Sequence, residues 1–184
     1  VDLFMFLPDQ GQEAGIVWSM ITTRTPALIG IKSSVGIYHG PAYNYLLLIP
    51  FLIGRGHPVS GAALSGVLDL MAMILLFIIG RRLFSVWAGL AAAAMWCSTA
   101  MIVYFARFGS DYCPLPFFVL LLFYSLLQIV SGRERWLLLL VPLLCIAWQL
   151  HDEVVLLFPF FGIVWLWFRP RIRIQTYAVA SLFG

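Results

Sequence analysis

Two long stretches that contain no charged residue or histidine constrain this chain most. They are Leu83–Ala106 and Tyr112–Val130. A helix needs about 20 mainly apolar residues to cross the roughly 30 Å hydrocarbon core of a bilayer. Both stretches therefore predict membrane-spanning helices. Gly61–Gly80 predicts a third, interrupted only by Asp69.

The composition of the whole chain agrees with a membrane location. Of its 184 residues, 62% are hydrophobic and 10% are charged, whereas about a quarter of a soluble domain is charged. This excludes a disordered chain and a nucleic-acid-binding module, so we expect no nucleic acid partner. The three cysteines, Cys97, Cys113 and Cys145, are widely spaced and predict neither a zinc site nor a disulfide framework.

The basic residues set the topology. They form three clusters at the ends of apolar runs: Arg81 and Arg82, then Arg133 and Arg135, then Arg169, Arg171 and Arg173. Cytoplasmic loops are enriched in Lys and Arg. If every cluster is cytoplasmic, the apolar stretch Trp136–Phe168 must cross twice, with His151, Asp152 and Glu153 at its outer turn. A single crossing would place the last cluster outside.

The predicted fold is all-α, a polytopic bundle of transmembrane helices that follows a long first external loop. In this loop, residues 1–60, we expect Glu13–Thr23 and Ala42–Ile53 to be helices that lie along the outer surface, because they are too short to span. The expected spans in residues 61–184 are about 61–80, 83–106, 112–130, 136–150 and 154–168, with the start of another from 177. The chain opens without Met and ends within an apolar run, which predicts a segment of a longer protein.

Polar residues collect on one side of this topology. Six of the eight acids and all three histidines fall on the non-cytoplasmic side: Asp2, Asp9, Glu13, Asp111, Asp152, Glu153, His39, His57 and His151. Acidic residues contribute little to membrane topology, so topology alone explains this asymmetry only weakly. The pattern indicates a polar pocket at the outer face.

Each of these candidates has two interpretations. Asp9 is a general base at the membrane surface or a helix-capping acid. Asp111 is a catalytic acid or a capping acid that pairs with Arg107, four residues earlier. His151 and Glu153 are metal ligands or one wall of a polar pocket, since adjacent residues of a regular helix do not face one another.

The succession of motifs resembles the C-type glycosyltransferase superfamily, close to the protein mannosyltransferase and aminoarabinose transferase families. The first external loop of these enzymes is similar to DQGQEA followed, about two dozen residues later, by IKSSVGIYHGPAYNYLLLIPFLIG. Their next two spans resemble the stretch from IIGRRLFSVWAGL to ARFGSDYCPLPFF. The pair of spans after these is similar to GRERWLLLLVPLLCIAWQLHDEVVLLFP.

The resemblance implies a reaction. A sugar passes, with inversion, from a polyprenyl-phosphate-linked donor to an acceptor hydroxyl on a protein, glycan or lipid, at the outer face of a plasma (inner) or ER-type membrane. An acid of the first external loop acts as the base, and the matching residue is Asp9. Asp111 is a second catalytic candidate.

The leaving phosphate in this reaction needs positive charge, from basic side chains or from a divalent metal ion. The candidates for substrate and phosphate binding are Arg107, Lys32, His39 and Tyr43, and those for a metal are His151 and Glu153.

A transporter or a non-catalytic membrane subunit is the alternative function. In that case Asp69 and the outer acids would form a path for protons or substrate. Transporters usually show internal repeats and paired spans interrupted by Gly or Pro, and neither is visible here. Small residues surround Asp69 in GAALSGVLDLMAM, which favours a hydrogen-bonded acid in a helix contact.

Overall fold

The computed structural model describes residues 7–33, 36–57 and 59–182, so the predicted outer acid Asp2 lies outside the described residues. The helices are α1 (Pro8–Thr23), α2 (Ala42–Ile53), α3 (Val59–Leu83), α4 (Val86–Ser98), α5 (Ala100–Phe105), α6 (Leu115–Val130), α7 (Leu137–Leu150), α8 (Leu157–Phe168) and α9 (Ile174–Ser181). Two short 3₁₀ helices, η1 (Glu134–Trp136) and η2 (Asp152–Leu156), precede α7 and α8. Within the described residues the only β-type pairing is an isolated bridge between Lys32 and Tyr38. The predicted all-α class is confirmed.

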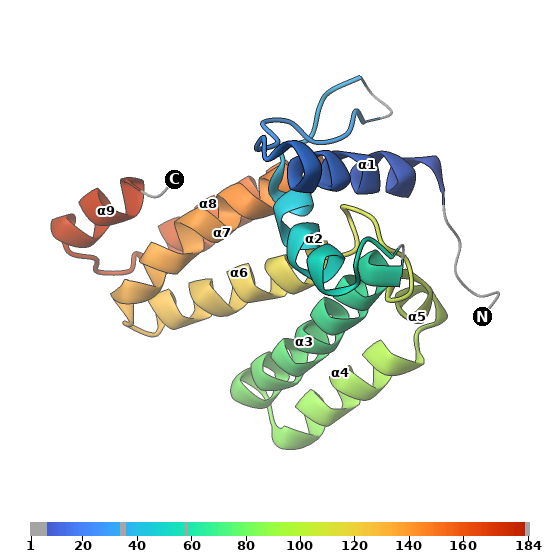
Figure 1. Cartoon of the computed structure of the whole chain (residues 1–184). Helices are drawn as coiled ribbons and strands as arrows, with labels where there is room; N and C mark the ends of the chain where they lie inside the picture. The colour runs from blue at the N-terminus through green and yellow to red at the C-terminus, as the bar shows by residue number, and fades with distance from the viewer. Residues whose placement is uncertain (1–6, 34–35, 58, 183–184) are drawn as a thin grey trace.

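The helices form two arms that meet under α1 (Figure 1). One arm is the hairpin of α3 and α4, and the other contains α6, α7 and α8. Helix α1 lies across the top of the molecule and packs on α2, which also contacts α3 and α7. Helix α2 therefore lies at the junction of the two arms, and the loop that precedes it carries His39.

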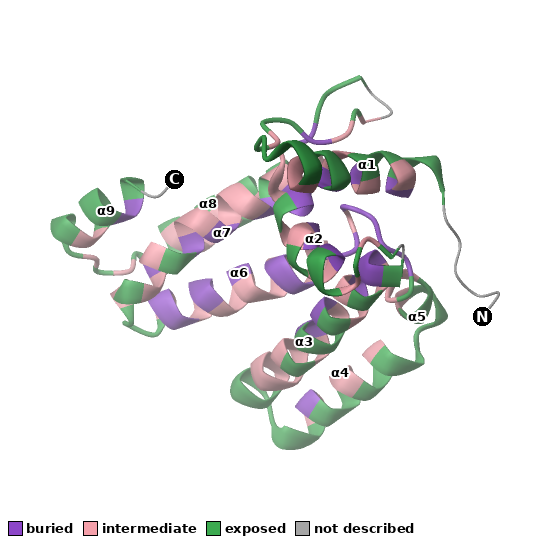
Figure 2. Ribbon diagram, viewed as in Figure 1, coloured by how far each residue is buried: buried purple, intermediate pink, exposed green. Residues whose placement is uncertain are grey.

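The helix surfaces suit a lipid environment. Among the described helices, α3 alone is both long and apolar enough to cross a bilayer, while α2, α4 and α6 are apolar but shorter. Large apolar side chains such as Trp87 on α4 and Trp167 on α8 are each 80% exposed. Most of α4 is exposed or only half-buried (Figure 2). The other crossings remain predictions.

The core lies between α2, α6 and α7. Leu122 and Ile129 of α6, Ala147 and Leu150 of α7, and Leu47 of α2 are all almost completely buried. Figure 2 shows buried segments along α2, α6 and α7. Burying apolar surface in this way contributes roughly 25 cal/mol per Å². This core holds together the ends of α2 and α7 that carry the polar residues described below.

Helix α2 has the predicted bounds, whereas the start of α1 and the predicted span 83–106 differ from the sequence predictions. Helix α1 begins at Pro8, because proline suits a first turn in which its missing N–H would have had no partner. The side chain of Gln10 also accepts a hydrogen bond from the backbone N–H of Leu7 at 2.8 Å. The predicted span 83–106 is broken at Thr99, whose extended backbone separates α4 from α5.

Candidate functional site

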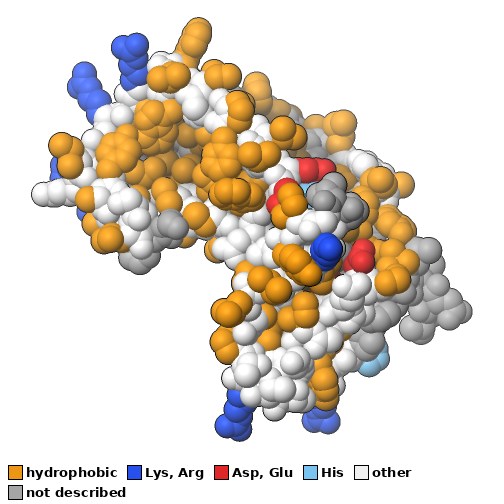
Figure 3. Space-filling model, turned by 90° about the horizontal axis from the view of Figure 1, so that it is seen from above, with side chains coloured by type: hydrophobic (Ala, Val, Ile, Leu, Met, Phe, Trp, Pro, Cys, Tyr) orange, Lys and Arg blue, Asp and Glu red, His pale blue; other side chains and the backbone are white. Residues whose placement is uncertain are grey.

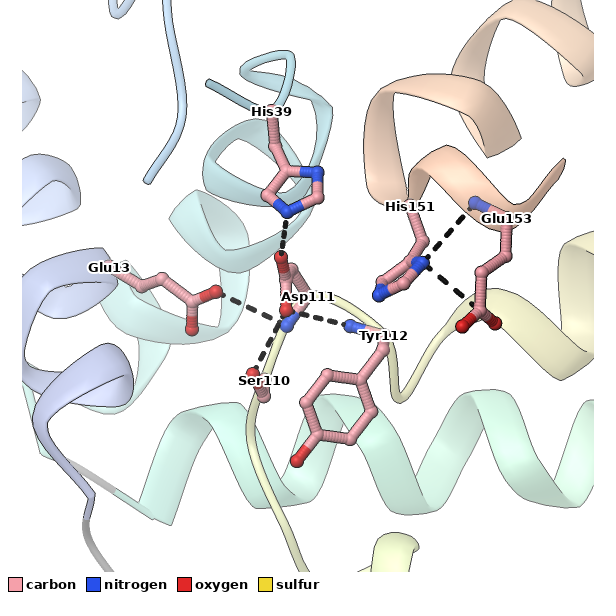
Figure 4. Close-up of polar contacts among 7 residues, drawn as sticks. All are labelled: Glu13, His39, Ser110, Asp111, Tyr112, His151 and Glu153. Carbon is pink, nitrogen blue, oxygen red and sulfur yellow. Dashed lines mark hydrogen bonds and ion pairs between the residues drawn. The ribbon is translucent and has the colours of Figure 1, made fainter. Parts of the chain in front are cut away.

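Seven polar residues from four distant segments form a cluster beneath α1 (Figure 4). They come from α1, the loop before α2, the loop between α5 and α6, and the turn after α7. We call this group the polar cluster, and its members are Glu13, His39, Ser110, Asp111, Tyr112, His151 and Glu153. Seen from above, the visible acidic side chains lie close to a basic side chain and a histidine, while hydrophobic side chains cover much of the rest of this face (Figure 3).

Asp111 is the centre of the polar cluster and is 6% exposed. Its Oδ1 accepts hydrogen bonds from the Ser110 hydroxyl and from the Tyr112 backbone N–H, both at 3.0 Å. Its Oδ2 lies 3.8 Å from His39 Nε2. Its own backbone N–H donates to Glu13 Oε1 at 3.2 Å. These contacts fix both the backbone and the carboxylate of Asp111.

A close backbone contact between Gly109 and Gly61 positions the loop that carries Asp111. A Cβ atom on Gly109 would lie 2.7 Å from the carbonyl carbon of Gly61 at the start of α3. Real Cβ atoms do not approach backbone so closely, so the residue at this position must be glycine for the loop to rest on α3. The loop is thereby held between α1 and α3.

His39 belongs to a loop that folds back on itself before α2. The backbone N–H of Gly30 donates to the His39 carbonyl at 2.8 Å, and the His39 N–H donates to the Ile31 carbonyl at 3.0 Å. The imidazole is 7% exposed, and its ring centroid lies 5.5 Å from that of His151. Figure 4 shows both rings beside Asp111.

The next residue, Gly40, brings this loop against α7. A Cβ atom at Gly40 would lie 2.4 Å from Cγ of Gln149, near the end of α7. Glycine therefore permits the approach that places His39 next to His151.

Glu13 is the most deeply buried acid of the polar cluster, at 1% exposure. Burial, followed by the negative charge of Asp111, raises the pKa of its carboxyl to about 9, and the charge of Asp9 contributes less. The hydrogen bond from the Asp111 N–H acts in the opposite direction. Glu13 is consequently a neutral carboxylic acid at pH 7.

Several buried polar atoms near the polar cluster have no hydrogen-bond partner among the described residues. They are Gln10 Nε2, Glu13 Oε2, His39 Nδ1, Tyr43 Oη and Asn44 Nδ2. Buried polar groups in native proteins are nearly always paired, with protein or with bound water. These atoms are thus available to water or to the polar groups of a ligand, and the predicted substrate contacts His39 and Tyr43 are among them.

A mostly apolar cavity of about 410 Å³ adjoins the polar cluster. Tyr112 and Glu153 line both, and the cavity extends to Asp69 on α3 and Trp96 on α4. Trp96 Nε1 donates a hydrogen bond to Asp69 Oδ1 at 3.0 Å. The bond joins the two helices, which favours the predicted packing interpretation of Asp69.

Four predicted site residues are not members of the polar cluster: Asp9, Lys32, Arg107 and the buried Tyr43. Asp9 is exposed in the first turn of α1, where a carboxylate interacts favourably with the helix dipole, although Leu7 occupies the N-cap position. Lys32 and Arg107 are exposed, and Lys32 Nζ lies 5.8 Å from the ring centre of Tyr38. The predicted pairing of Arg107 with Asp111 is wrong. Helix α5 ends at Phe105, so the two residues do not share a helical face, and Asp111 pairs with His39 instead.

The predicted metal site has only two potential ligands, His151 and Glu153. His151 Nδ1 lies 4.0 Å from Glu153 Oε2 and also accepts a hydrogen bond from the Glu153 backbone N–H. In the described part of the chain, no three side chains of His, Cys, Asp or Glu form a group able to hold a metal ion. Because these residues do not fit a metal centre, we derive no step of the reaction through one.

Glu13 is not among the site residues predicted from the sequence. The signal that points to it is its spacing from Gln10 and Val17, which puts all three on one face of α1. An acid between two residues of a buried helical face is itself buried. Its partner, 98 residues further along the chain, carries no local signal.

The family model of dolichyl-phosphate-mannose-protein mannosyltransferases matches residues 38–183. The chain belongs to this family. Its members are integral membrane glycosyltransferases that use a lipid-linked sugar donor, which confirms the resemblance drawn from the motifs. Neither the curated proteins nor the solved structures include a match to the chain. The matched range contains His39, Tyr43, Asp111 and His151, whereas α1, with Asp9 and Glu13, precedes it.

Proposed function

We propose that this mannosyltransferase-family chain transfers a sugar, with inversion, from a polyprenyl-phosphate-linked donor to an acceptor hydroxyl at the non-cytoplasmic face of the membrane. Family membership supports glycosyl transfer and a lipid-linked donor. The observation that carries the site assignment is the junction between the polar cluster and the apolar cavity, through Tyr112 and Glu153. The donor has the same two parts, a polar sugar phosphate and an apolar chain.

In this proposal the donor chain lies along the cavity and its phosphate faces the two imidazoles. His39 and His151 can donate N–H groups to phosphate oxygens, and such hydrogen bonds are strong when an ionised group takes part. Lys32 and Arg107 are exposed and lie outside the polar cluster, where their positive charge would attract an anionic headgroup. Asp111 orients His39 through its Oδ2.

The transfer itself needs a base for the acceptor. As the acceptor oxygen forms a bond to C1 of the sugar, the bond from C1 to the phosphate oxygen breaks and the phosphate leaves with the electron pair. Attack from the face opposite the phosphate inverts C1. We assign the acceptor proton to the carboxylate of Asp9, which is exposed one turn before Glu13 on α1.

The test measures release of polyprenyl phosphate by the purified protein in lipid bilayers. The bilayers contain polyprenyl-phosphate hexoses or pentoses, and the acceptors are hydroxyl-bearing peptides, glycans or lipids. We expect Asp9→Asn to lower kcat by about 10²-fold or more, the usual effect of removing a general base. We expect Asp111→Asn to lower it by at least about tenfold, because His39 loses its charged partner.

Glu134→Gln provides the matched control. It removes an acid that is not a member of the polar cluster and whose ion pair is with an exposed arginine, Arg173; such pairs contribute little to stability. We expect its turnover to equal that of the wild type. Full turnover by Asp9→Asn would refute its assignment as the base. If the wild type releases polyprenyl phosphate from none of the donors, the proposed function is refuted.

A further inference from the structure

The proposed reaction makes no direct use of Glu13, the most deeply buried acid of the polar cluster. Glu13 shares the buried face of α1 with Gln10 and Val17. Its Oε1 accepts the backbone N–H of Asp111 at 3.2 Å, a contact that spans 98 residues of sequence. The contact joins α1 to the loop between α5 and α6.

This contact helps to set the direction in which the Asp111 carboxylate points. The backbone N–H of Asp111 faces Glu13, while the carboxylate Oδ2 of the same residue faces His39. Ser110 and Tyr112 donate to the other carboxylate oxygen and fix the side-chain conformation. A shift of the Asp111 backbone is therefore passed directly to the carboxylate that meets His39 (Figure 4).

We propose that Glu13 is a positioning residue whose carboxyl oxygen, by accepting the Asp111 backbone N–H, holds the Asp111 loop against α1 and so keeps the Asp111 carboxylate directed at His39. The effect of Glu13 on turnover rests on the proposed function, whereas its hold on the loop does not.

The surroundings of Glu13 explain why it carries a proton. The acids whose charge reaches it are Asp111 from the loop and Asp9 from α1 itself. Tyr43 of α2, with Tyr112 and Cys113 of the loop, also lies within range of its charge. Together with burial, the two acids hold the pKa of Glu13 at about 9. Loss of the proton would place a second negative charge beside Asp111, away from water.

Two substitutions at this position separate the role of the oxygen from that of the charge. Glu13→Gln keeps an oxygen that can accept the Asp111 N–H and stays neutral at every pH. We expect kcat within about twofold of the wild type at pH 7, and activity that persists above pH 9, where the wild type declines. Glu13→Ala removes the acceptor, and we expect kcat to fall by at least about tenfold because Asp111 is displaced from His39.

Thermal unfolding provides a readout that does not depend on turnover. The pKa of Glu13 is higher in the folded chain than its ordinary value of 4.5. The stability of the wild type relative to Glu13→Gln is therefore greatest below pH 4.5, falls as the pH rises towards 9, and changes little above that. As the pH rises across this range, we therefore expect the unfolding temperature of Glu13→Gln to increase relative to that of the wild type. An infrared band of a protonated carboxyl group should also be present in the wild type at pH 7 and absent from Glu13→Gln.

The outcomes distinguish this proposal from the proposed function. An inactive Glu13→Gln with an intact unfolding transition would overturn the positioning role, because it would show that the reaction needs the ionisable carboxyl group of Glu13 itself. Wild-type turnover in a folded Glu13→Ala would also overturn it. An unfolding difference and infrared band as expected, combined with a wild type that transfers no sugar, would support the neutral state of Glu13 and reject the proposed function alone.

Discussion

Two acids one turn apart on α1 have different surroundings. Asp9 is exposed, while Glu13 is buried beside Asp111. Pairs of carboxyl groups in contrasting environments often divide chemical roles between them, because their surroundings differ in how strongly they favour the charged form. Here the exposed acid is accessible to an acceptor and the buried acid holds the loop. The roles follow from burial and not from residue type.

Gly40 determines how closely the His39 loop approaches α7. In Gly40→Ala the new Cβ would meet Cγ and Cβ of Gln149, and at 2.6 Å the Gln149 Cβ is fixed to its backbone and cannot rotate away. We expect a loss of about 1–3 kcal/mol in unfolding free energy, typical of overpacking, and at least a tenfold fall in kcat as His39 leaves His151. Chemical denaturation and the turnover assay measure the two effects.

The matched control for this substitution is Gly15→Ala. Gly15 lies on the exposed side of α1, and a Cβ there has no neighbour within 4 Å. Alanine is favoured over glycine inside a helix by roughly 0.5–1 kcal/mol, so this variant should be as stable as the wild type or more so. Equal behaviour of the two variants would show that the Gln149 contact does not position the loop.

At the scale of elements, the α3–α4 hairpin depends on a close glycine contact. A Cβ on Gly89 would lie 2.6 Å from the Phe77 carbonyl oxygen and 2.9 Å from the Arg81 nitrogen, both in the backbone of α3. Small residues allow helices to approach in this way within membranes, where close packing is a main source of helix association. The same pair of helices is joined further along by the hydrogen bond from Trp96 to Asp69.

We therefore expect Gly89→Ala to separate α3 from α4. The predicted cost is about 1–3 kcal/mol of unfolding free energy, measured by denaturation in detergent. The Trp96–Asp69 bond should lengthen as well, because both partners line the gap between the helices. Gly162→Ala in α8 is the control, since its Cβ would enter open space and its stability should not fall. A stable Gly89→Ala variant would mean that the two helices are not held by this contact.

At the scale of the whole molecule, the sequence predicts the helices better than their contacts. Ala42–Ile53 was predicted with its observed bounds, because an apolar run between Gly-Pro and Gly punctuation is a local feature. The break at Thr99 was missed because the residues on both sides of it remain apolar and uncharged. Apolar composition predicts the extent of a lipid-facing segment but not a change of backbone direction within it.

The candidate site was predicted in part. Sorting polar residues by side of the membrane selected His39, Asp111 and His151, and the structure brings these three together. The sequence alone could not show that Glu13 contacts Asp111, since that contact depends on how a loop packs between α1 and α3. Arg107 was paired with Asp111 by helical spacing, which failed because no helix connects them. Spacing rules hold only within one continuous element.

Two contacts made by residues of the basic clusters indicate how the helices are oriented relative to one another. Arg82 at the end of α3 donates to the Ser131 hydroxyl after α6 at 2.9 Å, and Arg173 before α9 pairs with Glu134 before α7 at 3.5 Å. Residues of all three basic clusters therefore lie at the ends of the helices remote from the polar cluster. This agrees with two crossings between Arg135 and Arg169 and with a cytoplasmic location for every cluster.

Cysteine labelling tests this orientation. In a variant with Cys97, Cys113 and Cys145 replaced by Ala, single cysteines are placed at Arg135, Asp152 and Arg171 in sealed vesicles of known orientation. We expect a membrane-impermeant maleimide to reach positions 135 and 171 from the cytoplasmic side and position 152 from the opposite side, because α7 and α8 return the chain to its starting side. Permeabilised vesicles, in which all three should react, control for accessibility. Labelling of positions 135 and 171 from opposite sides would instead mean a single crossing, and Asp152 would then lie within the membrane and away from an outer polar cluster.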